Sequence, residues 1–339
     1  MRAYPLTKHG GIDVLKMQEV DEPEPKEGEV KVSISHIGIN YAEILSRRGQ
    51  YQWAPKKPYV PGMEAYGTIE ALGPGVDRQI GEQVIVGSQY GAYAEKMVLP
   101  EYLAFPQLPA YTDAEQAAFL VNYMTAWVAL MKQARLQTDD KVLVTAAAGG
   151  VGTAAVQIAK HFGCSVLGTA SKDYKINLLN DLDIDAAINY QADDWDEKVR
   201  LFDAGGGVDV VLELVGGDTF KKAKGLLNPF GRIVIAGVAS LKWSKTNPLS
   251  WPSALKKIPR FDIRKMAIGS NGILATHIGY LIKNRELSMQ LWKELSSFTI
   301  EHKIKPVVSH VFDFDQLPQA HAYIESRKSY GKVVVKVRK

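Results

Sequence analysis

Cysteine is nearly absent from the sequence, which has one cysteine, Cys164, among 339 residues. A single thiol cannot form an intramolecular disulfide, and it makes a zinc site built from cysteines nearly impossible. Cys164 lies in the stretch HFGCSV, a turn before a predicted strand. We interpret it as a small buried residue rather than as a reactive thiol.

Long apolar runs and blocks of like charge are also missing. No stretch reaches the about eighteen apolar residues that indicate a membrane-spanning helix, and the start, MRAYPLTKHGGIDVLK, lacks the apolar core of a secretory signal. We therefore expect a cytoplasmic protein without stable membrane insertion. The 41 basic and 37 acidic residues are spread along the chain, so the net charge of +4 predicts weak attraction for small anions and no nucleic-acid partner.

The rest of the composition, with 46% apolar and 23% charged residues, is typical of a globular protein with a large core. The length predicts about two domains. Residues 1–100 carry short alternating runs separated by Gly and Pro, such as EVKVSISHIGIN from Glu29, which favour a β-rich unit. From about Leu120, strand-like and helix-like runs alternate, which predicts βαβ units and a parallel sheet.

The stretch VLVTAAAGGVGTAAVQIA, from Val142 to Ala159, combines a β-branched strand, a turn of small residues and a helix. Written as AxGxxG, its positions are Ala147 for the tight turn, Gly149 for close approach of a pyrophosphate, and Gly152 for close helix packing. The start of the helix presents free N–H groups and a partial positive charge to phosphates. With a second strand at the right distance, this pattern predicts a dinucleotide site.

The end of the next predicted strand decides between NADH and NADPH. An NAD site usually has an acid there that binds the ribose 2′-hydroxyl, but VLGTAS ends without one. Ser171, Lys172 and Lys175 follow instead and suit a 2′-phosphate, so we predict NADPH with Lys175 as the leading contact. Asp173 stands at an acceptable distance for the alternative, and we interpret it as a first-turn helix residue that the helix dipole favours.

The whole chain resembles the zinc-free quinone oxidoreductase branch of the medium-chain dehydrogenase/reductase superfamily. Several blocks carry the resemblance in the family's order: GINYAEILSRRGQY, PYVPGMEAYGTIEALGPGV, AAAGGVGTAAVQIA, GTASKDYK, NPFGRIVIAG and KPVVSHVFDFDQLPQAHAYIESRKSYGKVVV. Through PGMEA, LVNYMTA and HIGYL it is most similar to the vesicle amine transport protein-like subgroup.

The resemblance implies an α/β fold with a Rossmann doubly wound parallel sheet and a GroES-like β-rich domain. The GroES-like catalytic domain would span residues 1–120, completed by 277–339, and the Rossmann domain 121–276, with the active cleft between the two. It also implies which residues bind the cofactor. Those at the pyrophosphate would be Ala148, Gly149, Gly150 and Val151; those at the adenosine phosphate Ser171, Lys175 and Tyr190; and those on the nicotinamide side Gly237, Val238 and Ala239.

Departures from the zinc-dependent relatives argue against a metal site. Asn40 stands where those enzymes carry a metal-binding cysteine, and Met63 stands where they carry the histidine of a GHE motif. Glu64 remains, but one carboxylate is not a catalytic zinc site. No two histidines have i, i+4 ligand spacing beside a carboxylate, and His321 is interpreted as a packing or surface residue. Alcohol oxidation, which relies on metal coordination of the alcohol, is therefore disfavoured.

Bound NADPH can deliver hydride to an electron-poor acceptor without metal help, and quinones and α,β-unsaturated carbonyls suit this chemistry. Hydrogen-bond donors near the acceptor oxygen would stabilise the transition state. The resemblance points to Asn40, Tyr51 and Thr125 as the catalytic candidates, and to Tyr41 and Asn122 as the second choice. No residue stands out as a general acid, so the second proton would come from water.

The sequence leaves three functions open. The first is an NADPH-dependent quinone reductase, the second an enone or enal reductase, and the third a nucleotide-bound interaction protein with little catalysis. For the third, the irregular segment Trp243–Trp251 would be the contact surface. The resemblance also implies a homodimer that pairs the strand GILAT, beginning at Gly272, since an open apolar edge strand is a liability.

Overall fold

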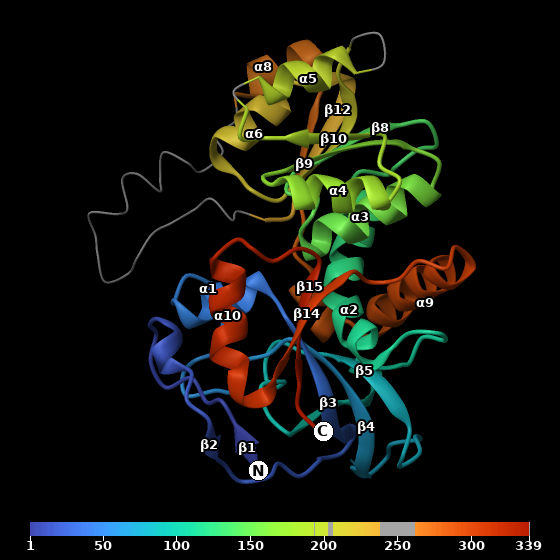
Figure 1. The fold of residues 1–339 in the computed structure, drawn as a ribbon. Coiled ribbons are helices and arrows are strands. Elements are labelled where there is room, and N and C mark those ends of the chain that lie inside the picture. Colours follow the sequence, from blue (N-terminus) through green and yellow to red (C-terminus); the bar gives the residue numbers. More distant parts are fainter. Residues whose placement is uncertain (193, 203–205, 238–261, 339) are drawn as a thin grey trace. The chain divides into compact units, whose positions relative to one another are not determined.

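The computed structural model describes residues 1–192, 194–202, 206–237 and 262–338. The described chain divides into two compact units, one formed by Met1–Met124 with Gly279–Lys339 and the other by Thr125–Ile278. Figure 1 shows a mostly antiparallel sheet in the first unit and a parallel sheet in the second. The predicted fold class, a GroES-like β-rich domain with a Rossmann parallel sheet, is confirmed.

The first unit is built on a seven-stranded sheet. Its strands follow the order β14 (Val308–Asp313), β15 (Lys332–Lys336), β3 (Glu29–Ile39), β4 (Glu64–Leu72), β5 (Gln83–Gly87) and β7 (Ala104–Pro106), and β6 (Lys96–Pro100) also pairs with β3. A small separate sheet joins β1 (Arg2–Ala3) to β2 (Gln18–Glu19). The helices of this unit are α1 (Tyr41–Arg47), α9 (Arg285–Glu301), α10 (Leu317–Glu325) and all but the last turn of α2 (Asp113–Trp127). Short helical turns are η1 (Ile12–Val14), η2 (Glu101–Leu103), η5 (Ile278–Lys283) and η6 (Phe314–Gln316).

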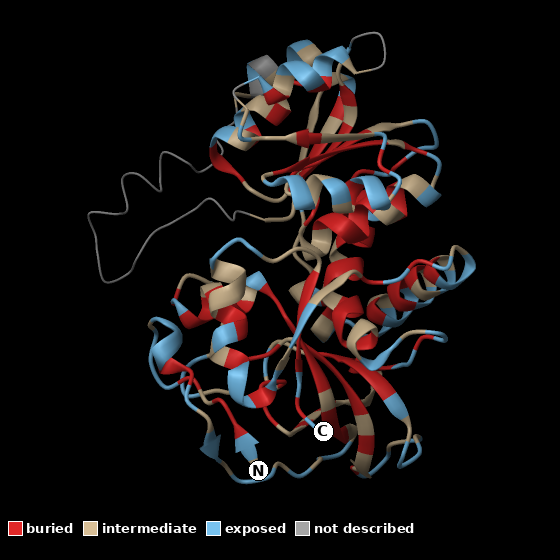
Figure 2. Ribbon diagram, viewed as in Figure 1, coloured by how far each residue is buried: buried red, intermediate tan, exposed pale blue. Residues whose placement is uncertain are grey.

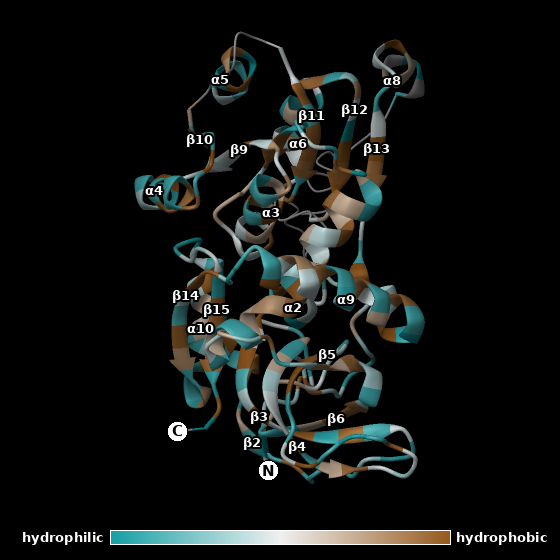
Figure 3. Cartoon of the chain, turned by 90° about the vertical axis from the view of Figure 1, so that its right-hand side faces the viewer, coloured by the Kyte–Doolittle hydropathy of each residue, from teal (hydrophilic) through white to brown (hydrophobic). Residues whose placement is uncertain are grey.

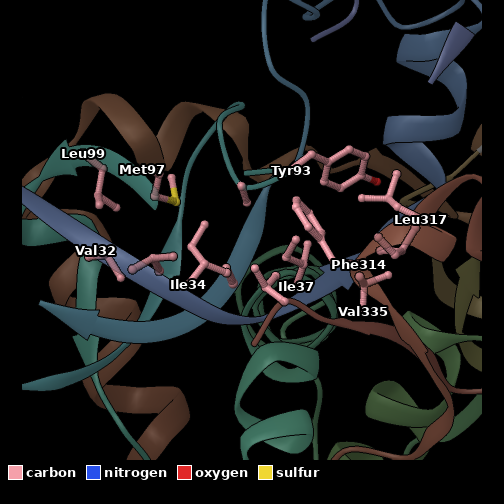
Figure 4. Close-up of a cluster of buried hydrophobic side chains, with 14 of the residues drawn as sticks. Val32, Ile34, Ile37, Tyr93, Met97, Leu99, Phe314, Leu317 and Val335 are labelled. Carbon is pink, nitrogen blue, oxygen red and sulfur yellow. The ribbon is translucent and has the colours of Figure 1, made fainter. Parts of the chain in front are cut away.

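Both halves of strand β3 contribute side chains to the core, although the positions of its inward-facing residues shift by one in the middle of the strand. Its apolar residues in the core cluster are Val30, Val32, Ile34, Ile37 and Ile39. The spacing changes from even to odd positions after Ile34, and the pairing with β4 is irregular between Ile34 and His36. An extra residue in one strand reverses the faces of the residues that follow, so both halves of β3 point into the same core. Figure 4 shows Val32, Ile34 and Ile37 in this cluster.

The last strand of the chain completes the sheet that the first hundred residues begin. β15 runs antiparallel to β3, with Val333 opposite Ile39 and Val335 opposite Ile37. Val333 and Val335 are buried in the same cluster as Phe314 and Leu317, which lie just before and at the start of α10. The N-terminal and C-terminal segments therefore share one core (Figure 4).

The second unit holds a six-stranded parallel sheet. Its order is β10 (Ala186–Asn189), β9 (Ser165–Ala170), β8 (Lys141–Val144), β11 (Val208–Glu213), β12 (Leu227–Ile235) and β13 (Gly272–Ala275). The described helices are α3 (Gly150–His161), α4 (Asp173–Asp181), α5 (Trp195–Leu201), α6 (Gly217–Lys224) and α8 (Ile263–Gly269), and η3 (Val128–Gln133) is a π-helix that continues α2.

The strand order of this sheet reverses between β8 and β11. Ligands of doubly wound sheets bind at such a point, beyond the carboxyl ends of the strands. The central strands are apolar because helices cover parallel sheets on both faces. β11 is mostly brown in Figure 3, whereas α5 shows much teal, and in Figure 2 the central strands β8, β9 and β11 are largely buried.

Among the described residues, no helix is both long and apolar enough to cross a membrane. The cytoplasmic location expected from the sequence stays a prediction.

Candidate functional site

The turn after β8 brings a helix N-terminus against two main-chain carbonyl groups. A Cβ atom at Gly152 would lie 2.5 Å from the carbonyl oxygen of Ala147 and 2.6 Å from that of Ala146. Any side chain there would push α3 away from the turn, so glycine is required. The sharp bend itself is made by Ala146, whose φ of 49° is left-handed, one residue before the position that the sequence pattern suggested.

The first N–H groups of α3 have no hydrogen-bond acceptor within the helix. The helix begins at Gly150 with Gly149 as N-cap, and no side chain caps it. The first N–H groups of a helix have no partner inside it, and together with the helix dipole they favour an anion. Ala148 is buried, while Gly149, Gly150 and Val151 are partly exposed. The four residues predicted for the pyrophosphate therefore lie together on one cradle that fits a diphosphate.

The residues predicted for the adenosine phosphate gather at the ends of two neighbouring strands. Ser171 follows β9 and Tyr190 follows β10, and the amide of Tyr190 donates to the Ala170 carbonyl oxygen at 3.0 Å. Lys175 is the third residue of α4, and its Nζ lies 5.9 Å from the centre of the Tyr174 ring. Asp173 is the first residue of the same helix, which agrees with its interpretation as a first-turn residue.

Gly237 is the one residue of the predicted nicotinamide side that the structure describes. A Cβ atom there would lie 2.8 Å from the carbonyl oxygen of Leu214, so the chain after β12 passes close to the end of β11. Val238, Ala239 and the segment Trp243–Trp251 lie outside the described residues.

A buried polar cluster in the first unit surrounds Asn40. Asn40 is the N-cap of α1 in a capping box with Glu43. Its Oδ1 accepts from the Lys332 ammonium at 2.6 Å, and its Nδ2 donates to Glu64 Oε1 at 3.0 Å. Lys332 also donates to Glu64 Oε1, and Glu64 Oε2 accepts from the Val121 amide at 2.8 Å. Because the ammonium can only donate and the carboxylate can only accept, the orientation of the Asn40 amide is determined by its neighbours.

The cluster continues from Glu43 to His321. Glu43 Oε1 accepts from the Met63 amide at 2.7 Å, and its Oε2 accepts from the Tyr93 hydroxyl at 2.5 Å. The same hydroxyl contacts His321 Nε2 at 2.8 Å. Burial raises the pKa of Glu43, and burial with the nearby Arg47 charge lowers the pKa of His321 to about 3. His321 is therefore a neutral core residue.

The other catalytic candidates are divided between the units. Tyr51 is partly buried in the first unit, and its ring lies 5.8 Å from that of Trp53. Burial, together with the charge of Glu43, raises the pKa of Tyr51 to about 12. Tyr41 is exposed at the start of α1, and Asn122 is buried on α2. Thr125 is also on α2 but belongs to the second unit, whereas Asn40 and Tyr51 both belong to the first.

Two family descriptions match this chain. Residues 26–110 match the alcohol dehydrogenase GroES-like domain, and residues 150–270 match the zinc-binding dehydrogenase. The human synaptic vesicle membrane protein VAT-1 homolog is 32% identical over 343 residues, which cover 99% of this chain and 86% of that protein. The chain belongs to the medium-chain dehydrogenase/reductase superfamily.

Other members of the superfamily support the branch that the sequence predicted. The quinone oxidoreductase-like protein 2 homolog of Nematostella vectensis is 33% identical over 319 residues, which cover 91% of this chain and 82% of that protein. The solved structure of Escherichia coli quinone oxidoreductase complexed with NADPH has a TM-score of 0.88 at 27% identity, covering 99% of this chain and 100% of that chain.

One of the matched descriptions implies zinc, but the donor set of this medium-chain dehydrogenase/reductase does not fit that ion. The resemblance assigns Asn40, Met63 and Glu64 to the metal positions, and a thioether and a carboxamide are poor zinc ligands. Glu64 already binds an ammonium group, the Asn40 amide and a backbone amide. In the part of the chain that the structure describes, no three His, Cys, Asp or Glu residues could hold a metal ion together.

Reasoning from the sequence missed several charged and polar groups that the fold buries. Lys332, Glu43, Tyr93 and Glu213 were not among the candidates, yet each is almost fully buried. Two of these residues could have been recognised from the sequence. Lys332 and Glu213 stand at the ends of the strand runs KVVVK and VDVVLE, where a charged residue beside a buried strand needs a partner.

Replacing Lys332 tests the buried cluster. Lys332→Met leaves the Glu64 carboxylate buried without its cation, so we expect a loss of about 3–5 kcal/mol in the stability of the first unit. The loss is measured as reduced hydrogen-exchange protection in β3 and β15 during urea titration. The double variant Lys332→Met/Glu64→Gln removes both charges and should recover part of the loss.

Lys221→Met is the matched control, because Lys221 pairs with Asp218 on the surface of the second unit at 2.8 Å. An exposed pair contributes only about 0–1 kcal/mol. Equal effects of the two single substitutions would contradict the role assigned to Lys332.

Proposed function

We propose that the protein is an NADPH-dependent oxidoreductase that transfers hydride to quinones without a zinc ion. The observation that carries the proposal is the cradle at Ala148–Val151, where glycine is required at position 152 and the amides of α3 are open to an anion. Its support comes from relatives named as quinone oxidoreductases, one of them solved in complex with NADPH.

The second end of the cofactor would lie at Ser171, Lys175 and Tyr190. Ser171 and Tyr190 follow adjacent strands, and Lys175 is in the first turn of α4. A 2′-phosphate carries up to two negative charges, and a lysine with a hydroxyl group supplies the charge-assisted hydrogen bonds that favour it over a 2′-hydroxyl. We therefore propose that NADPH is preferred over NADH.

The nicotinamide, when bound, supplies the hydride, and the protein supplies position and polarity. We assign Tyr51 as the donor to the acceptor oxygen. A tyrosine hydroxyl is protonated at neutral pH, and the raised pKa of Tyr51, about 12, does not change this, so it can donate to an oxygen that gains negative charge. Asn40 is a positioning residue in this proposal, because its amide is engaged by Lys332 and Glu64. Thr125 is a further donor, and water supplies the second proton.

A homodimer through β13 also belongs to the proposal. β13 is at the end of the six-stranded sheet and pairs only with β12 among the described strands. A second copy would cover this open edge.

Leu274→Pro tests the dimer, since proline removes a backbone donor and disrupts strand pairing. We expect monomers or insoluble protein, measured by sedimentation velocity, whereas Leu274→Val should assemble like the wild type. An undisturbed dimer in the proline variant would count against this interface.

The function itself is tested by following NADPH absorbance with a panel of quinones, enones and enals. We expect turnover of quinones, and Tyr51→Phe should lower kcat by about 10²-fold, the usual effect of removing a donor to a developing oxyanion. Turnover of enals alone would indicate an unsaturated-carbonyl reductase. Tight NADPH binding without turnover of any acceptor would indicate an interaction protein instead.

Lys175→Ala tests the cofactor preference. Because one charge-assisted hydrogen bond is worth about 1.5–3 kcal/mol, the ratio of kcat/KM for NADPH to that for NADH should fall at least about tenfold. Lys198→Ala, which removes an exposed lysine paired with Asp194, is the control and should leave the ratio unchanged. The assignment is wrong if both variants keep the ratio of the wild type.

A further inference from the structure

Glu213 is a buried carboxyl group that the proposed function does not use. It is the last residue of β11 and has 0% exposure. Its Oε1 accepts from the amides of Val215 and Gly216, both at 2.7 Å. Its Oε2 is buried and has no hydrogen-bond partner among the described residues. A carboxyl oxygen without a partner in the protein interior is costly when it is ionised.

This carboxyl group lies where the strand order of the sheet reverses, on the strand beside the start of the turn that leads into the cradle. β11 is paired with β8, and Thr145 is the residue that follows β8. The Thr145 amide donates to the Leu212 carbonyl oxygen at 3.0 Å, and the Thr145 hydroxyl accepts from the Leu214 amide at 2.8 Å. Ala146, the left-handed residue of the glycine turn, comes next. One set of hydrogen bonds thus holds both the turn that Glu213 caps and the start of the cradle.

The pKa of Glu213 lies near neutral pH. Burial raises its pKa to about 7, against the amides of Gly216 and Val215, which donate to Oε1 and stabilise the ionised form. The neighbouring elements bring mostly uncharged residues to this end of the sheet: Thr145 follows β8, and β12 ends at Ile235. Helix α6 begins at Gly217, and the acid in its first turn is Asp218. No charged side chain in the described ranges is among the causes of the shift.

We propose that Glu213 is a proton-dependent positioning residue of the dinucleotide site, which takes up a proton at Oε2 when the anionic cofactor binds. The proposal rests on the proposed function, because it needs a diphosphate in the cradle. A buried negative charge on the strand next to the turn that would hold the diphosphate is unfavourable, and a proton from the solvent removes it. Oε1 keeps its two amide donors in both states, so the turn at Val215 and Gly216 is retained.

The direction of the pH dependence follows from linkage. If the bound anion raises the pKa of Glu213, protonation must tighten binding of the anion by the same factor. Affinity for the dinucleotide is then highest below pH 7 and falls as the pH rises through the pKa of Glu213. A rise of one pKa unit corresponds to a tenfold change in Kd at most.

The test is calorimetric titration of the full-length protein with NADPH at pH 6, 7 and 8, in buffers of different ionisation enthalpy. At pH 7 the wild type should take up more protons than Glu213→Gln. Its Kd should rise about three- to tenfold more from pH 6 to pH 8 than the Kd of the variant. The difference between the two proteins isolates Glu213, because the 2′-phosphate of NADPH titrates in both. Asp218→Asn, an exposed acid on α6, should behave like the wild type.

Equal proton uptake and equal pH dependence in wild type and Glu213→Gln would overturn the inference. If the variant does not fold, difference infrared spectroscopy of the wild type at pH 7 provides the second measurement. NADPH should then increase the band of a protonated carboxyl group, and no change in that band would overturn the inference. Absence of NADPH binding at every pH would instead overturn the proposed function, and this inference with it.

Discussion

The close approach of α3 to the carbonyl groups of Ala146 and Ala147 is the constraint on which the rest of the second unit depends. At 2.5 Å from a carbonyl oxygen there is no room for a Cβ atom at Gly152. That missing atom lets the helix start directly beyond β8, so its first amides point out of the carboxyl edge of the sheet. The ends of β9, β10, β11 and β12 lie at the same edge because all of these strands are parallel.

The first unit is held together by a buried ion pair, Lys332 with Glu64, rather than by a close contact between main-chain atoms. Lys332 on β15 connects Asn40, after β3, with Glu64 on β4, and Glu64 in turn binds the amide of Val121 on α2. An uncompensated charge in this interior would cost several kcal/mol, so the sheet is complete only when its C-terminal strand is in place. The same contacts occupy Asn40 and Glu64, two of the three residues that the resemblance assigns to metal positions.

The two units hold different kinds of polar group. The second unit has main-chain amides without a helical partner at the start of α3, and the first unit has a half-buried phenol, Tyr51, with a raised pKa. Relatives with this fold carry names as different as synaptic vesicle membrane protein and quinone oxidoreductase-like protein. A fold shared by such proteins does not decide function, which depends on the particular side chains at the site.

The sequence by itself determined the parallel sheet, the glycine turn and the family. Strand periodicity, glycine spacing and block order are local patterns that can be read without knowing which segments meet. It also indicated that Asp173 lies in the first turn of a helix that contains Lys175, because both positions depend on one helix start. Only the tertiary structure decided the partners of Asn40, the neutral state of His321 and the burial of Glu213. Those properties depend on contacts such as that of Lys332 with Glu64, 268 residues apart, and no local pattern encodes which distant group will share a desolvated position.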